Sequence, residues 1–218
     1  MRRSQSTIEA NMSGKALRYA YTLWAPFYDL LLGASAISKA RSRSIALLSE
    51  WTGKKVLVVG IGTGLDIPIL PSGAHYTGID ITPAMLARAR HCAQQCGTPI
   101  ELLPGNAMLL DFADEVFDRI ILHLILAVVP SPERAFNEAV RVLKPGGEIL
   151  ILDKFLRPNQ KAPLRRALNI LTRNLATRTD VVFEDILAPS AGLKIIHDQP
   201  ALMRGWFRHI VLHKDPNG

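Results

Sequence analysis

The sequence predicts an α/β fold in which a doubly wound, mostly parallel sheet carries helices on both faces. Short apolar runs alternate with helical patterns between residues 54 and 154, as expected for parallel strands joined by crossover helices. The apolar run 56–59 is followed by three glycines at alternate positions, Gly60, Gly62 and Gly64. Glycines after a buried strand let a ligand approach the backbone closely, because no Cβ is in the way. We therefore expect a ligand at the carboxyl ends of the strands.

Length and composition favour a single domain. A chain of 218 residues with 48% hydrophobic content can bury one substantial core. No run of eighteen apolar residues is free of charge, so no transmembrane helix is expected, and the N-terminus lacks the apolar stretch of a secretory signal. We expect a cytoplasmic protein with an N-terminal helical cover over 1–50, a ligand-binding core over 54–154, and a basic helix with C-terminal strands over 155–218.

The chain before the glycine loop is expected to be helical in two parts. Residues 1–13 are predicted to be a loosely attached tail, and residues 14–34 are rich in aromatic and apolar side chains. Pro26 should bend or break a helix in this second stretch. Residues 37–51 are predicted to form the next helix, with apolar points that include Trp51.

The alternating part of the chain is expected to supply most of the sheet. Strands are predicted at 56–59, 75–79, 99–103, 117–122 and 148–153, and helices at 83–96 and 131–143. Thr82 is expected to cap the first of these helices, with Pro83 at its first position. After residue 160 a helical pattern precedes two strand-like runs, GLKIIHD and GWFRHIVLHK, which favour an antiparallel end to the sheet.

An acidic residue at the end of the second predicted strand indicates an adenosine-containing cofactor. Asp80 lies twenty residues after Gly60, where a carboxylate can accept hydrogen bonds from both hydroxyls of a ribose. A dinucleotide fold uses G-x-G-x-x-G, but Leu65 occupies the place of that third glycine. Asp66 follows at once, and its carboxylate would repel a pyrophosphate at a helix start. S-adenosylmethionine has no phosphate and carries a sulfonium and an ammonium, so it suits this loop better.

Five segments within residues 54–154 resemble class I S-adenosylmethionine-dependent methyltransferases in order and spacing: VLVVGIGTG, GIDITPAML, GNA, FDRIILHLILAVVP and RVLKPGGEILILD. The resemblance implies a Rossmann-like, seven-stranded sheet whose last strand runs antiparallel. Together with the loop, it gives the expected cofactor-binding residues Gly60, Gly62, Gly64, Asp66, Asp80, Ile81, Asn106, Ala107 and Leu122.

Two positions depart from the pattern of that family. Val58 stands two residues before the first glycine, where the family usually has an acid. Asp66 is a candidate to replace it at the methionine end of the cofactor, the alternative being a solvated carboxylate at a helix start. Asn106 replaces the aspartate of Gly-Asp-Ala, and its carbonyl can still accept a hydrogen bond from the adenine amine.

The N-terminal segment YAYTLWAPFYDLLLGA resembles the N-terminal helix of bacterial phosphatidylethanolamine N-methyltransferases and, less closely, of ubiquinone and menaquinone C-methyltransferases. In such enzymes this segment covers the cofactor and helps to form the substrate pocket. The resemblance makes Tyr19, Tyr28 and Asp29 catalytic candidates. The aromatic face of either tyrosine can attract the ammonium product of each methylation. Apolar packing is the alternative role for these rings, and it is the expected one for Tyr21.

Further candidates end the predicted central strands. His123 follows a buried strand at the ligand edge, where it could accept a proton or bind a phosphate; a purely structural role is the alternative. Asp153 would suit an amine and Lys154 a lipid phosphate. Cys92, Cys96 and His91 form a poor ligand set, so we expect reduced cysteines and no metal.

The net charge of +7 favours an anionic partner. Residues 154–178 carry seven basic and no acidic side chains, with leucines at helical spacing, as in a helix that lies in a membrane interface. The alternative is a helix that packs its leucines on the sheet. Base-amine methyltransferases usually carry N/D-P-P-Y/F where this chain reads LHLI, so no nucleic acid is expected. The predicted partners are a lipid substrate and the anionic inner face of the membrane.

These observations predict an S-adenosylmethionine-dependent N-methyltransferase that acts on an aminophospholipid head group, with phosphatidylethanolamine as the expected acceptor. A methyltransferase of a quinone precursor or of a small soluble amine is the first alternative. A catalytically silent protein that binds S-adenosylmethionine is the second, because Val58 removes a usual cofactor contact. The oligomeric state, the acceptor and the number of methyl groups transferred stay open.

Overall fold

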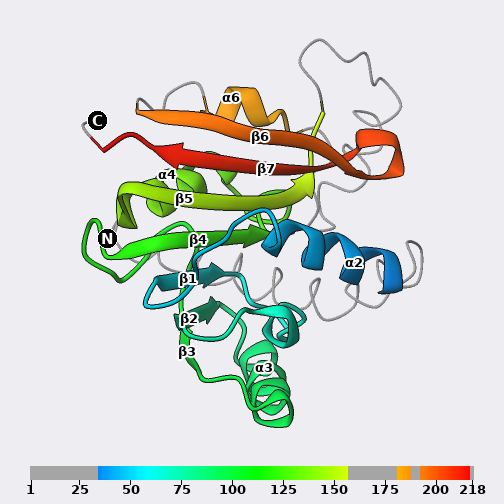
Figure 1. Ribbon diagram of the computed structural model, residues 1–218, viewed down its shortest axis with the longest axis vertical. Coiled ribbons are helices and arrows are strands. Elements are labelled where there is room, and N and C mark those ends of the chain that lie inside the picture. Colours follow the sequence, from blue (N-terminus) through cyan, green and yellow to red (C-terminus); the bar gives the residue numbers. More distant parts are fainter. Residues whose placement is uncertain (1–33, 157–180, 188–191, 217–218) are drawn as a thin grey trace, which may run out of the picture.

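The computed structural model describes residues 34–156, 181–187 and 192–216, which form a seven-stranded sheet with helices on both faces (Figure 1). The strand order is β3-β2-β1-β4-β5-β7-β6. The strands are β1 (Lys55–Val59), β2 (His75–Asp80), β3 (Ile100–Pro104), β4 (Phe117–His123), β5 (Leu143–Lys154), β6 (Leu193–Leu202) and β7 (Phe207–Lys214). Strands β1 to β5 are parallel, and β7 runs antiparallel between β5 and β6. The predicted fold class is confirmed, including the antiparallel last strand.

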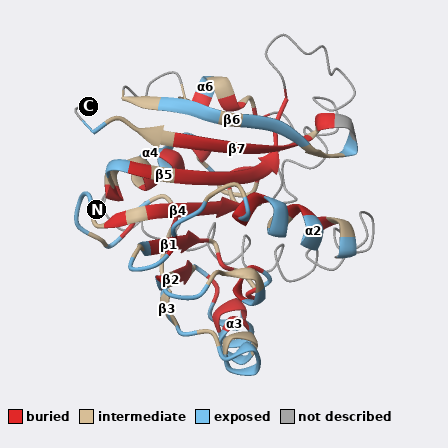
Figure 2. Ribbon diagram, viewed as in Figure 1, coloured by how far each residue is buried: buried red, intermediate tan, exposed pale blue. Residues whose placement is uncertain are grey.

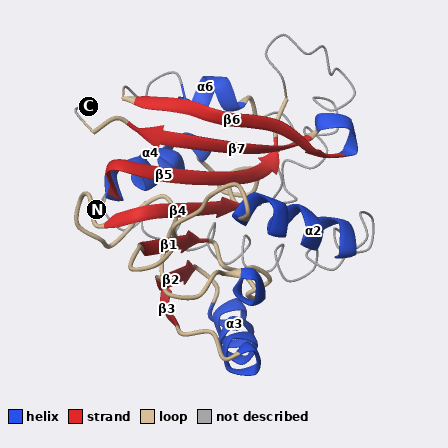
Figure 3. Cartoon of the chain, in the orientation of Figure 1, coloured by secondary structure: helices blue, strands red, loops and turns tan. Residues whose placement is uncertain are grey.

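Helices lie on opposite faces of this sheet (Figure 3). They are α2 (Ala34–Ile45), α3 (Pro83–Cys96), α4 (Pro132–Val142) and α6 (Phe183–Leu187), with 3-10 turns η1 (Ile67–Ile69) and η2 (Met203–Gly205). Ile45 of α2 and Leu86 of α3 pack in one core cluster with the β1 residue Val58. Phe136 of α4 and Phe183 of α6 belong to the cluster on the other face.

The central strands supply the core. Leu57, Ile120, Ile121 and Ile149 are completely buried, because strands covered on both faces are apolar on both sides of the pleat. Figure 2 shows the central strands buried and the edge strand β6 largely exposed. None of the helices in the described part of the chain combines the length and the apolarity needed to cross a membrane.

The helix predicted over 37–51 ends earlier, at Ile45. Glu50 then adopts a left-handed φ of 57°, which redirects the chain and brings Trp51 to the sheet. The Arg119 guanidinium lies 4.5 Å from the centroid of the Trp51 ring, and the indole N–H donates to the Leu48 carbonyl. A cation over an indole face is favourable when both are shielded from water, so burying Trp51 outweighs six more residues of helix.

Two other local predictions need correction. Strand β5 begins at Leu143 rather than at residue 148, and a register shift between the Phe117 and Arg119 pairings absorbs the turn at residues 144–147. The predicted basic segment also starts in the sheet, because Lys154 ends β5 and Leu156 pairs with Val182. Residues 157–178, like residues 1–33 of the predicted cover over 1–50, lie outside the described residues.

Helix α3 has the predicted bounds, but its N-terminus is held differently from the expectation. The Thr82 side chain makes no capping bond, and the Thr82 N–H donates to the carboxylate of Asp80. At the other end Gly97 has a φ of 66° and its N–H reaches the last carbonyls of the helix. Gly64, in the loop after β1, lies under the helix, where an added Cβ would sit 2.8 Å from Ile67 Cδ1 and 3.1 Å from Ala89 Cα.

These two glycines give a matched test of close packing beneath α3. Both have positive φ, so alanine at either position costs roughly 1–2 kcal/mol of backbone strain. Gly97→Ala adds no contact within 4 Å. Gly64→Ala should cost about 1–3 kcal/mol more, the usual penalty for overpacking. Urea unfolding of the two variants measures the difference, and equal free energies of unfolding would contradict the packing described for Gly64.

Candidate functional site

The glycine loop after β1 is shaped by two close contacts and one open position. Gly60, Gly62 and Gly64 all have positive φ, at 70°, 57° and 89°. A Cβ on Gly60 would lie 2.5 Å from Ile125 Cδ1, so this glycine lets the loop after β4 pack against β1. A Cβ on Gly62 would meet only the Gly60 carbonyl, at 3.9 Å, among the described residues. Gly62 is therefore the point where a ligand can approach the backbone.

Asp80 is held against this loop at the end of β2. Its Oδ2 accepts the Gly62 N–H at 2.9 Å, and its Oδ1 accepts the Thr82 N–H at 2.8 Å. Burial raises the pKa of Asp80, while the hydrogen bonds from Thr82 and Gly62 act in the opposite direction. A carboxylate has about four acceptor positions, so each oxygen can accept one more hydrogen bond. The geometry fits the predicted contact with two ribose hydroxyls.

Ile81 follows β2, and Asn106 and Ala107 follow β3, so these predicted cofactor-binding residues lie in loops at the carboxyl ends of the two strands. Ile81 is 48% exposed beside Asp80. The Asn106 side-chain carbonyl accepts the Met108 N–H at 2.9 Å, which closes a turn around Ala107. One lone pair of that carbonyl is thus used within the turn, and one is left for an amine donor. The Leu122 side chain, by contrast, is completely buried in the core, so the structure places it inside the sheet packing.

A buried polar network joins the glycine loop to β4 and α2. Asp66 is 2% exposed; its Oδ1 lies 2.8 Å from His123 Nδ1, and its Oδ2 accepts from Arg41 at 2.6 Å. His123 Nε2 lies 2.9 Å from the hydroxyl of Ser44, which is fully buried. Burial alone would raise the pKa of Asp66, but its interactions with His123 and Arg41 hold that pKa well below the usual range. The alternative of a solvated carboxylate at position 66 is therefore wrong.

Arg41 and Ser44 were not among the predicted site residues. They lie three positions apart in the segment predicted as a helix, so the sequence does place them on one face. A face with an arginine and a serine, flanked by the apolar positions 37 and 45, was the available signal. The partners lie 25 and 79 residues away in the chain, and no local pattern identifies them.

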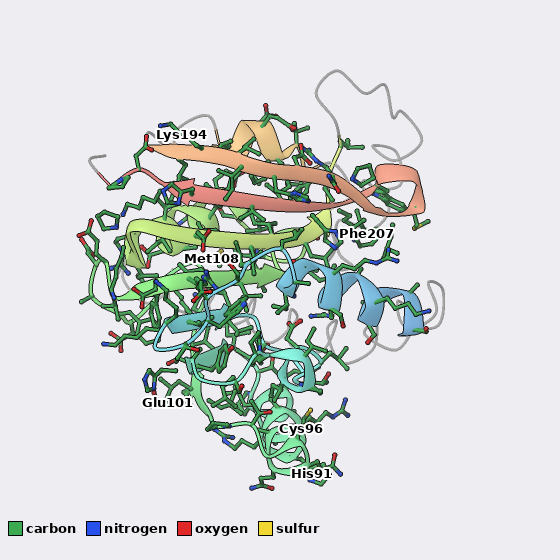
Figure 4. All side chains as sticks on the ribbon, viewed as in Figure 1. His91, Cys96, Glu101, Met108, Lys194 and Phe207 are labelled. Atoms are coloured by element: carbon green, nitrogen blue, oxygen red, sulfur yellow. The ribbon has the colours of Figure 1, made fainter. Side chains whose placement is uncertain are left out.

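A second set of buried polar groups lies at the ends of β5 and β7. The Asp153 carboxylate accepts the N–H groups of Ala127 and Lys154, and burial raises its pKa. Burial lowers the pKa of Lys154 to about 8, although the Asp153 charge opposes that shift. His209 Nε2 lies 2.9 Å from the Ala40 carbonyl and fixes α2 at another point. Figure 4 places Phe207, next to these groups, beside α2.

The structure thus brings together two groups of predicted residues, the loop glycines with Asp80, and Asp66 with His123. Tyr19, Tyr28 and Asp29 lie outside the described residues. Cys92 and Cys96 are free thiols, and the Cys92 thiol donates to the Gly64 carbonyl at 3.5 Å. Figure 4 shows His91 and Cys96 on α3, away from the strand ends.

The residues present fit S-adenosylmethionine and do not fit a dinucleotide. Only the three-residue turn η1 follows the glycine loop, so the loop has no long helix whose N-terminus could bind a pyrophosphate. The open backbone at Gly62 and the carboxylate of Asp80 remain suited to an adenosine, and the exposed Ile81 to an apolar base.

Comparison with known proteins agrees with this assignment. A protein family described as a methyltransferase domain matches residues 57–151. The phosphatidylethanolamine N-methyltransferase of Cereibacter sphaeroides is 36% identical over 197 residues, which cover 88% of this chain and 94% of that protein. The demethylmenaquinone methyltransferase of Thermus thermophilus is 35% identical over 136 residues, or 59% of this chain and 61% of the relative.

Solved structures show the same fold at lower sequence identity. A putative sarcosine dimethylglycine methyltransferase from Galdieria sulphuraria has a TM-score of 0.68 at 16% identity, covering 82% of this chain and 85% of that one. The [4+2]-cyclase SpnF has a TM-score of 0.66 at 20% identity, covering 82% and 80%. Because one of these folds carries a cyclase, the fold alone does not give the reaction.

The relative from Cereibacter sphaeroides is 36% identical and matches almost the whole of both chains, and the Asp80 carboxylate lies against the glycine loop as the family resemblance implies. This protein therefore belongs to the S-adenosylmethionine-dependent methyltransferases, and S-adenosylmethionine is its cofactor.

Proposed function

We propose that this enzyme methylates the amine of an aminophospholipid head group, with phosphatidylethanolamine as the acceptor. One observation carries the choice: the match to a phosphatidylethanolamine N-methyltransferase spans 88% of this chain. The two matches to quinone methyltransferases that follow it span 59% and 67% of the chain, at 35% and 32% identity. A quinone precursor is therefore the second candidate acceptor.

The residues of the chain have separate tasks in this reaction. When bound, the cofactor supplies an activated methyl group on a sulfonium and leaves as a neutral thioether, while the amine loses one proton for each transfer. Asp80 holds the ribose hydroxyls, and Gly62 lets the cofactor lie against the backbone. Helix α2, fixed at the carboxyl edge of the sheet, limits the access of water to the reacting groups.

The acceptor side is assigned to the N-terminal cover. Tyr19 and Tyr28 would attract the methylated ammonium through their aromatic faces, and Asp29 would accept a proton from the amine or pair with it. His123 is the fourth catalytic candidate. Its two ring nitrogens contact Asp66 and Ser44. A direct role in proton transfer therefore requires the contact between His123 Nε2 and the Ser44 hydroxyl to break.

We also propose that the enzyme works at the cytoplasmic face of an anionic membrane, because its acceptor is a lipid. The basic residues between 154 and 178 support this proposal through their charge. Lys154 is buried at the end of β5, so the support comes from Arg157, Lys161, Arg165, Arg166, Arg173 and Arg178. Exposed cationic side chains beside a membrane surface attract anionic lipids, and this attraction weakens with salt.

The role of Asp80 is tested by the Asp80→Ala variant. The loss of a charged hydrogen-bond acceptor should weaken the binding of S-adenosylmethionine by about 1–3 kcal/mol, measured by isothermal titration calorimetry. Asp118→Ala is the matched control. Asp118 also accepts a backbone N–H, but it lies at the amino end of β4, away from the carboxyl ends of the strands. Unchanged affinity in a folded Asp80→Ala protein would contradict the cofactor site.

The acceptor is tested with labelled cofactor and purified lipids. Phosphatidylethanolamine should give mono-, di- and trimethyl products, whereas quinone precursors and soluble amines should stay unlabelled. Tyr28→Ala should lower kcat strongly with little change in cofactor affinity, because its ring acts on the acceptor and the transition state. Tyr21→Ala, at a position assigned to packing, is the control. Label on a quinone precursor and none on the lipid would replace the proposed acceptor by the second candidate.

Membrane association is tested by sedimentation with vesicles. The protein should sediment with vesicles that contain anionic lipid and much less with neutral ones, and salt should release it. Replacement of Arg165 and Arg166 by glutamine should reduce sedimentation with the anionic vesicles, while the same change at Arg88 and Arg90 of α3 should not. Equal binding to both kinds of vesicle, or none to either, would contradict an electrostatic attachment.

A further inference from the structure

Arg41 and Ser44 have been given no part in holding the cofactor or the acceptor, and the polar side-chain atoms of Asp66 and His123 are engaged with each other and with Arg41 and Ser44. The members of this network come from three elements: Arg41 and Ser44 from α2, Asp66 from the glycine loop, and His123 from the last position of β4. Every link is short, from 2.6 to 2.9 Å. All four side chains are buried or nearly so, with Arg41 the most exposed at 11%.

Two chemical roles for this network conflict with its geometry. The connections Ser44–His123–Asp66 have the order of a hydrolase triad, but the Ser44 side chain is completely buried and cannot meet a substrate. Asp66 is also poorly placed to receive the ammonium of the cofactor directly. One of its oxygens is bound to His123 and the other to Arg41, and the residue is 2% exposed.

The network does connect the cofactor site to the helix that follows the predicted cover. Asp66 is two residues from Gly64, in the loop that carries the open backbone of Gly62. Arg41 and Ser44 lie in α2, which begins at the last residue of the aromatic segment 14–34. Helix α2 also contacts the ends of β5 and β6 and the turn η1. The position of α2 is thus tied to the conformation of the glycine loop.

We propose that Arg41, Asp66, His123 and Ser44 are positioning residues that lock α2 to the glycine loop, so that cofactor binding and the seating of α2 stabilise each other. If the loop conformation that binds the cofactor is also the one that pairs Asp66 with Arg41, then each event favours the other by the same factor. The inference rests on the methyltransferase assignment alone and holds for any acceptor.

Charge makes this lock sensitive to the removal of single members. Arg41 and Asp66 carry opposite charges, and His123 Nδ1 lies within hydrogen-bond distance of the Asp66 carboxylate. Removing one partner leaves a buried charge without its counterpart, which is strongly unfavourable. Removing both charges together avoids that penalty but still disconnects α2 from the loop. The double variant therefore separates the loss of the lock from the cost of an unpaired charge.

The test measures binding of S-adenosylmethionine by calorimetry in the absence of any acceptor. Asp66→Asn, Arg41→Gln and the double variant should each bind about tenfold more weakly or worse, and the double variant should lose less than the product of the single losses. Ser44→Ala removes only a hydroxyl and serves as the variant that keeps the charge pair; it should weaken binding in the same direction. Glu148→Gln is the control, because it removes the charge that pairs with Arg119 in a partly buried ion pair, between β4 and β5 and away from the carboxyl ends of these strands.

Hydrogen exchange gives a second readout that a purely structural role would not change. In the wild-type protein, S-adenosylmethionine should slow exchange of the amides in residues 34–45, and in Asp66→Asn this protection should be lost even when the site is saturated. Affinity within about twofold of wild type in folded Asp66→Asn and Ser44→Ala proteins would overturn the proposal. So would an equal loss of affinity in Glu148→Gln, or protection of α2 that persists in Asp66→Asn. Because no acceptor is present, a wrong acceptor assignment cannot produce any of these results.

Discussion

The burial of the Asp66 carboxylate is the constraint on which the ligand edge of this protein depends. A carboxylate that is 2% exposed must be paired, because removing a charge from water costs several kcal/mol unless partners replace the solvent. The pairing demands a donor from β4 and a cation from α2, and these are His123 and Arg41. His123 in turn needs a partner for its second nitrogen, which Ser44 provides. One buried charge thereby fixes the relation between three elements that are distant in sequence.

The glycine loop is positioned by packing on both sides, and this packing leaves its centre open. Gly60 accommodates Ile125 and Gly64 accommodates α3, so the loop touches the connection after β4 and the helix after β2. Between them, Gly62 donates its N–H to Asp80 and presents free space on its other side. The proposed adenosine site therefore depends on the missing side chain of Gly62 as much as on the carboxylate of Asp80. Val58, in the place of the usual acid, is a buried core residue of β1, and Asp66 is already paired with two other groups.

The sequence predicts those parts of this structure that depend on neighbouring residues. Helix α3 has the expected bounds because Pro83 starts it and Gly97 ends it, and strands β1 to β4 agree with the prediction to within one residue. The end of α2 could not be foreseen, because it depends on the contact of Trp51 with Arg119, 68 positions further along the chain. The contacts of Asp66 with Arg41 and His123 could not be predicted for the same reason, because these residues are also distant from it in the sequence. The glycine loop and Asp80 could be predicted from the sequence. They end β1 and β2, which pair in parallel, so their spacing in the chain indicates that they lie side by side.

The fold of this sheet is common to proteins with different reactions, as the likeness to a cyclase shows. What distinguishes one acceptor from another must therefore lie in the elements added around the strand ends. In this chain α2 is such an element, and its contacts with the shared core are polar and specific: Ala40 with His209, Arg41 with Asp66, and Ser44 with His123. An apolar contact alone would let the helix slide along the sheet edge, whereas three directional contacts fix both its position and its rotation. A helix attached in this way has a fixed position at the strand ends, which suits methyl transfer because the reacting atoms must be aligned.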